Sequence, residues 1–147
     1  MTQATTTLYE ADFVQWSDRT AQLLRERQFA ALDLDHLIEE IEDLGNRHRD
    51  ALESQLTRLL MHLLIWQFQP DHRSPSWSGF IKEARKQIKR LCRRYPSLKN
   101  YLEQCIPDCY GDAVEDATDE TGLSLSTFPA ECSYAIADIL DPNFLPD

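Results

Sequence analysis

The residues best suited to chemistry follow the most apolar run of the chain, where a predicted helix ends near Pro70 and the next begins near Ser74. His72 and Arg73 lie in the turn between them. A helix start offers unpaired backbone N–H groups that favour an anion, and an arginine can add two parallel hydrogen bonds to a phosphate or carboxylate. The spacing predicts a binding site whose candidate residues are His62, His72, Arg73, Ser74, Ser76 and Trp77.

Each candidate also has a purely structural interpretation. His62 lies within a run of leucines, where a charged imidazolium would be costly to bury, so we expect a buried, neutral histidine near pH 7. Arg73 can equally clamp an acidic helix of its own chain, through Glu40 or Glu42. His48, Gln55 and His62 recur every seven residues, which suits either a polar pocket or a row of satisfied core groups.

Enzymatic chemistry is the alternative hypothesis. The pair Arg58 and His62 is similar to one found in a class of helical ribonucleases, although its spacing is one residue too short. A nucleic-acid-associated or phosphate-handling enzyme would use His62, His72 and Arg73. The pattern identifies no reaction, so the catalytic residues are unassigned.

The sequence predicts neither a metal site nor a cofactor. Carboxylates crowd one helical segment, but the Glu-x-x-His repeat typical of di-metal helical bundles does not occur, which favours a solvated acidic face at Glu39, Glu40, Glu42 and Asp43. Cys105 and Cys109 are four residues apart without a matching second pair, so we expect buried thiols and no zinc site.

Charge is distributed very unevenly along the 147 residues, whose formal net charge is −10. Residues 1–70 contain six Lys or Arg against twelve Asp or Glu, residues 71–100 contain nine against two, and residues 101–147 contain none against eleven. The basic face of residues 82–94 either binds phosphates or is neutralised by the acidic segments, within the chain or across a dimer. We expect nucleic-acid binding to be weak and sensitive to salt.

The hydrophobic periodicity predicts an all-α, single-domain helical bundle of five to seven helices over residues 1–147, after a loose tail at 1–8. Asp12 caps a first helix to about Arg27, and a long second helix runs from Asp33 or Asp35 to Gln67 across Gly45. A third helix runs to about Arg94, capped either by Ser74 with Pro75 at its first position or by Ser76 one step later. Ser97 caps a further helix, and Pro107 either interrupts it or starts another, with a stop at Gly122. A last helix spans about residues 130–140.

Several strings together resemble the bacterial family called domain of unknown function 29, common in cyanobacteria. They are Tyr9-Glu-x-Asp12-Phe13-x-x-Trp16, Glu39-Glu-Ile-Glu-Asp-Leu-Gly45, His62-Leu-Leu-x-Trp66-Gln, Gln69-Pro70 with Arg73-Ser-x-Ser-Trp77, Pro96-Ser-Leu98, Glu120-Thr-Gly-Leu123, Phe128-Pro129 and Asp141-x-x-Phe144-x-Pro146. The resemblance implies an all-helical fold of about this size and supplies no catalytic residue, cofactor or substrate. The chain departs from the family pattern at Ile65, where a lysine is usual, and at Ser133, where a proline is usual.

The leading functional hypothesis is a cytoplasmic helical module that binds a protein partner or a second copy of itself through its charged faces. The chain starts without the basic and apolar stretches of a signal peptide, and its apolar run from Leu59 to Trp66 is too short to span a bilayer, so we expect no membrane partner.

Overall fold

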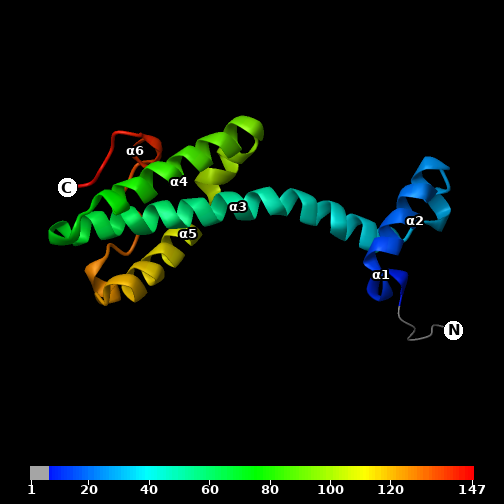
Figure 1. The fold of residues 1–147 in the computed structure, drawn as a ribbon, viewed down its shortest axis with the longest axis horizontal. Helices are drawn as coiled ribbons and strands as arrows, with labels where there is room; N and C mark the ends of the chain where they lie inside the picture. The colour runs from blue at the N-terminus through cyan, green and yellow to red at the C-terminus, as the bar shows by residue number, and fades with distance from the viewer. Residues whose placement is uncertain (1–6) are drawn as a thin grey trace. The chain divides into compact units, whose positions relative to one another are not determined.

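Six α-helices make up most of the chain in the computed structural model, which describes residues 7–147, and no strand occurs within these residues (Figure 1). In chain order they are α1 (Leu8–Ala11), α2 (Phe13–Arg25), α3 (Leu34–Phe68), α4 (Pro75–Arg94), α5 (Leu98–Thr121) and α6 (Ile136–Leu140). Short 3₁₀ helices lie between them: η1 (Phe29–Ala31), η2 (Pro70–His72) and η3 (Leu125–Thr127). The prediction of an all-α fold with one long helix is confirmed.

Contacts within the chain divide it into two compact units, Met1–Asn46 and Arg47–Asp147, and α3 belongs to both. That residues 1–147 form one domain stays a prediction. The predicted tail at residues 1–8 falls mostly on residues 1–6, which lie outside the described residues. Its end is corrected, because the Thr7 hydroxyl accepts a hydrogen bond from the Glu10 N–H (3.3 Å) and thereby caps a short helix that includes Leu8.

Aromatic stacking holds the first unit together. The Tyr9 ring stacks on His36 of α3, with ring centroids 3.9 Å apart, and meets Trp16 of α2 edge-on at 4.9 Å. The Tyr9 O–H donates a hydrogen bond to the Glu40 carboxylate, which raises the pKa of Tyr9 to about 12. Asp12 caps α2 as predicted, accepting a hydrogen bond from a backbone N–H at 3.1 Å.

The long helix α3 runs without a break through Gly45, which confirms the prediction of one helix rather than two. Asp33 opens it by accepting a hydrogen bond from the His36 N–H (3.4 Å). The single glycine costs only about 1 kcal/mol relative to alanine, which one position in so long a helix can absorb.

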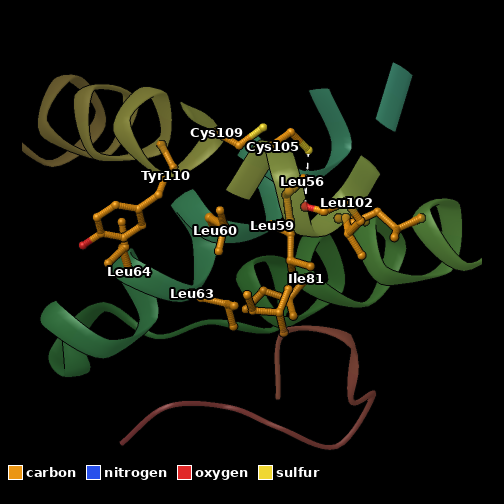
Figure 2. Packing of buried hydrophobic residues seen from close by; sticks show 14 of the residues in the cluster. Leu56, Leu59, Leu60, Leu63, Leu64, Ile81, Leu102, Cys105, Cys109 and Tyr110 are labelled. Atoms are coloured by element: carbon orange, nitrogen blue, oxygen red, sulfur yellow. Dashed lines mark hydrogen bonds between the residues drawn. The ribbon is translucent and has the colours of Figure 1, made fainter. Parts of the chain in front are cut away.

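The core of the second unit forms where α4 and α5 pack against the second half of α3 (Figure 1). Figure 2 shows the α3 leucines at its centre, with side chains of α4 and α5 around them: Leu56, Leu59, Leu60, Leu63, Leu64, Ile81, Leu102, Cys105, Cys109 and Tyr110. This apolar burial is the main stabilising contribution to the unit.

The helix α5 differs from its prediction at both Pro107 and Ser97. It continues through Pro107, although an interior proline costs roughly 3 kcal/mol. We attribute its continuity to tertiary packing, since the turns on either side bury Cys105 and Cys109 in the core while Pro107 faces solvent. Ser97 precedes the helix without making a side-chain cap, so the predicted cap is wrong. Gly122 ends it in a left-handed conformation (φ 76°), as predicted.

The last helix is shorter than predicted, because only Ile136–Leu140 is helical and residues 130–135 are not. Two tyrosines hold this segment in place instead. The Tyr110 O–H donates to the Pro129 carbonyl and the Tyr134 O–H to the Gln67 side-chain carbonyl, both at 2.7 Å. These tertiary hydrogen bonds fix a path that a continuous helix would not follow.

Candidate functional site

His62, a candidate from the sequence, lies in the core with 8% of its surface exposed. Its Nδ1–H donates a hydrogen bond to the Arg58 carbonyl (2.8 Å), and its ring lies 5.0 Å from that of Phe80. Burial lowers the pKa of His62, and the nearby positive charge of Arg58 acts in the same direction. The expectation of a buried, neutral histidine agrees with this geometry.

Acidification should therefore destabilise the protein through His62. Because its folded-state pKa lies below the ordinary value near 6.5, the unfolded chain binds the proton more readily, and stability falls as the pH drops below about 6.5. Denaturant melts at several pH values should show a smaller loss between about pH 7 and 5 for His62→Leu than for the parent. Equal losses would show that His62 does not contribute to the pH dependence.

Arg73 binds the chain's own backbone. Its Nε donates to the Trp66 carbonyl at the end of α3 (2.8 Å), and Nη2 donates to the Pro146 carbonyl (3.4 Å). Its guanidinium also lies 5.1 Å from the centre of the Trp66 ring, in cation–π geometry. The arginine thus ties the C-terminal segment to α3 through carbonyls, whereas the sequence suggested a carboxylate partner at Glu40 or Glu42.

The remaining predicted residues lie at the start of α4. The Ser74 hydroxyl caps the helix by accepting from the Trp77 N–H (3.3 Å), with Pro75 in the first turn, which selects Ser74 over the alternative cap Ser76. Trp77 packs against the core, while His72 and Ser76 are exposed. The helix start therefore carries one cap and one packed aromatic.

A larger feature, which we call the basic groove, lies between α4, α5 and α6 and encloses about 830 Å³. Its charged residues come mainly from α4: Lys82, Arg85, Lys86, Lys89, Arg93, Lys99 and Glu103. Its apolar residues come from all three helices and the segments beside them: Ile88, Cys92, Pro96, Leu102, Ile136, Leu140 and Pro142. The groove therefore has an apolar surface bordered by a rim of mostly positive charge.

All four lysines of the chain line this groove. The basic face of residues 82–94 is visible in the sequence, which predicts either phosphate binding or neutralisation by the acidic segments. The apolar part of the groove could not be recognised from the sequence, because residues of α5 and α6, which are distant in sequence from α4, complete it.

Arg85 builds one wall of the groove. The periodicity placed it on the solvated basic face, but the residue is buried, with 6% of its surface exposed. Its Nε donates to the Ile139 carbonyl (2.8 Å) and Nη2 to the Asp138 carbonyl (3.3 Å), which holds the last turn of α6 against α4. A cation at the carbonyl end of a helix is also favoured by the helix dipole.

The exposed cations of the groove form no ion pair with a carboxylate in the part of the chain that the structure describes. Within residues 7–147, no carboxylate oxygen lies within 4.0 Å of the side-chain nitrogens of the exposed rim residues Lys82, Lys86, Lys89, Arg93 and Lys99. The basic face was expected either to bind phosphates or to be neutralised by acidic segments. The described residues show no ion pairs that would neutralise it within the chain. An anionic partner would meet unpaired cations here.

The sequence matches the family described as Domain of unknown function DUF29 over residues 8–145. The chain belongs to this family. No curated protein and no solved structure matches it. Because the family description names no activity, the function of this DUF29 chain has to be inferred from its own geometry.

The structure places Ile65, where the resemblance to the family led us to expect a lysine, in the core cluster with 1% of its surface exposed. An isoleucine can be buried at this position at no cost in charge desolvation, whereas a buried lysine would need a partner for its charge.

A second hollow in the DUF29 chain has the opposite charge. It lies between α3 and α5 and encloses about 520 Å³, with a lining of Glu53, Ser54, Thr57, Arg58, Met61, Asp112, Glu115 and Asp116. Such a surface repels phosphates, so an anionic ligand would be directed to the basic groove instead.

Residues 7–147 contain no group of three or more His, Cys, Asp or Glu side chains arranged to hold a metal ion. None of the described helices is both long enough and apolar enough to cross a bilayer.

Proposed function

We propose that this chain is a protein-binding module whose basic groove takes an acidic amphipathic helix from a partner protein. The observation that carries the proposal is the combination of an apolar surface with an unpaired lysine rim, in which all four lysines of the chain take part. Helix-in-groove recognition uses apolar anchors on one helical face and complementary charges beside them.

A protein partner suits the groove better than a nucleic acid does. None of the fourteen lining residues is aromatic, so bases would find no ring on which to stack. The nearby aromatics Trp77 and Tyr95 pack against the core instead. A phosphate backbone would bury little of the apolar surface of Ile88, Leu102 and Leu140, whereas a leucine-rich helix would bury much of it and so bind more favourably.

The contacts of His62 and Arg73 also favour binding over phosphate-handling catalysis. His62 is buried and hydrogen-bonded to backbone, and Arg73 is engaged by two backbone carbonyls and the Trp66 ring. Each of these two side chains already has partners within its own chain, which leaves less of its hydrogen-bonding capacity for a substrate.

We also propose that the chain works in the cytoplasm. Its four cysteines are free thiols, and three of them, Cys92, Cys105 and Cys109, are buried. Burial raises the pKa of each of these three thiols, which keeps them protonated and unreactive. Such usage is typical of a reducing compartment.

Binding can be tested with a fluorescent amphipathic helical peptide of about 15 residues, with leucines at i, i+3, i+4 and i+7 flanked by glutamates. We expect the parent to bind it, and Lys86→Glu with Lys89→Glu to weaken binding by more than about tenfold. The matched control is Arg90→Glu with Arg94→Glu, an identical double charge reversal at exposed α4 residues outside the groove. Binding should also weaken as salt increases.

Two comparisons decide between the protein and nucleic-acid hypotheses. A peptide with lysines in place of the glutamates should not bind, and single-stranded RNA should bind less tightly than the acidic peptide. Tighter RNA binding that persists at high salt would contradict the proposal, as would equal effects of the groove and control substitutions.

A further inference from the structure

The first half of α3 carries a row of large apolar side chains that nothing in its own unit covers. We call Leu34, Ile38, Ile41 and Leu44 the apolar stripe, and each is 53–57% exposed. At 100° per residue, these four positions fall within about a third of the helix circumference. The row is therefore a continuous apolar face and not a scatter of single exposed residues.

Acidic residues border the apolar stripe. Asp35, Glu39 and Glu42 follow one edge of it on the same helix, and all three are exposed. Within residues 7–147, no Lys or Arg nitrogen lies within 4.0 Å of these carboxylates. This segment is itself an acidic amphipathic helix, which is the kind of ligand proposed above for the basic groove.

The two surfaces also agree in length. Leu34 to Leu44 spans about 15 Å along the helix axis, and Lys82 to Arg93 on α4 spans about 17 Å, at 1.5 Å per residue. Each surface has an apolar part and charges of one sign, and the signs are opposite.

We infer that the occupant of the basic groove is the apolar stripe of a second copy of this chain. The inference rests on the proposed function, and it names the partner for the same groove. Contact between two different surfaces is heterologous, so it produces either a closed pair with two equivalent contacts or a larger assembly. The apolar surface drives association, and the lysines and carboxylates select the orientation.

Complementation between two full-length variants tests this contact. Ile38→Asp with Ile41→Asp disables the stripe and leaves the groove intact, whereas Lys86→Glu with Lys89→Glu disables the groove and leaves the stripe intact. We expect the parent to self-associate in sedimentation velocity and each variant alone to be monomeric. An equimolar mixture should form a 1:1 dimer, since it contains one working stripe and one working groove.

Two controls accompany the mixture. Val14→Asp introduces one such aspartate at an apolar residue of α2 that is 70% exposed and lies off the stripe, and it should self-associate like the parent. Circular dichroism should show parental helix content for every variant, because all the substituted side chains are exposed. The acidic peptide probe should compete with the second copy and disperse the parent assembly.

The outcomes separate the inference from the function on which it rests. A monomeric parent that still binds the acidic peptide in its groove would overturn the second-copy inference and leave the proposed function standing. Self-association lost in the stripe variant but kept in the groove variant would overturn it too, by showing a stripe-to-stripe contact. A parent that neither binds the peptide nor self-associates would overturn both.

Discussion

Replacing Arg85 with methionine should lower the free energy of unfolding by about 2–4 kcal/mol and release α6 from α4. Methionine retains much of the apolar stem, but it cannot donate to the Ile139 and Asp138 carbonyls, which then lose their charged partner. Because Ile136 and Leu140 of α6 line the basic groove, affinity for the acidic peptide should fall together with stability.

Denaturant melts and hydrogen exchange measure the two effects separately. We expect the α6 amide of Ile139, which donates to the Ala135 carbonyl (2.9 Å), to exchange faster in Arg85→Met than in the parent. The control is Arg93→Met, since Arg93 lines the same groove but is exposed, and it should leave the melting midpoint nearly unchanged. Unchanged exchange at α6 in Arg85→Met would show that other contacts hold that helix.

Leu60→Ala should cost about 2–5 kcal/mol, because it leaves a cavity in the centre of the core. Leu60 is 0% exposed and is surrounded by side chains of the second unit (Figure 2). A loss of this size is a large share of the roughly 5–15 kcal/mol that stabilises a typical domain.

Leu34→Ala provides the matched comparison, with the same residue change in the same helix. Leu34 is 55% exposed, so within a single copy the change should alter stability by no more than about 0.5 kcal/mol. Urea melts of dilute protein measure both values. A large loss in Leu34→Ala that grows with protein concentration would indicate that a second copy covers the stripe, as inferred above.

Local features of the chain were predictable from the sequence because they depend on short-range physics. The period of the apolar residues indicated an all-α fold and a long helix through Gly45. Asp12 and Ser74 were recognised as caps, because a capping side chain bonds an N–H only a few residues away. His62 was expected to be buried from its position among leucines alone.

Other features were decided by tertiary contacts that no short window of sequence contains. Pro107 should have broken a helix by its local chemistry, yet the core contacts of both flanking turns keep α5 continuous. The sequence near residue 130 has a helical pattern, but residues 130–135 are not helical, because hydrogen bonds from Tyr110 and Tyr134 hold this segment in another conformation.

Most importantly, the two halves of the apolar face of α3 differ in burial, although the same apolar period runs through both. Its second half is buried by α4 and α5, and its first half leaves the apolar stripe exposed, although periodicity alone makes no distinction between them. The basic groove arises in the same way. Its lysines are neighbours in sequence, but its apolar surface exists only because α5 and α6 are brought beside α4, where Arg85 holds α6 through carbonyls more than fifty residues away. Periodicity determines which residues share a helical face, and packing determines whether anything covers that face.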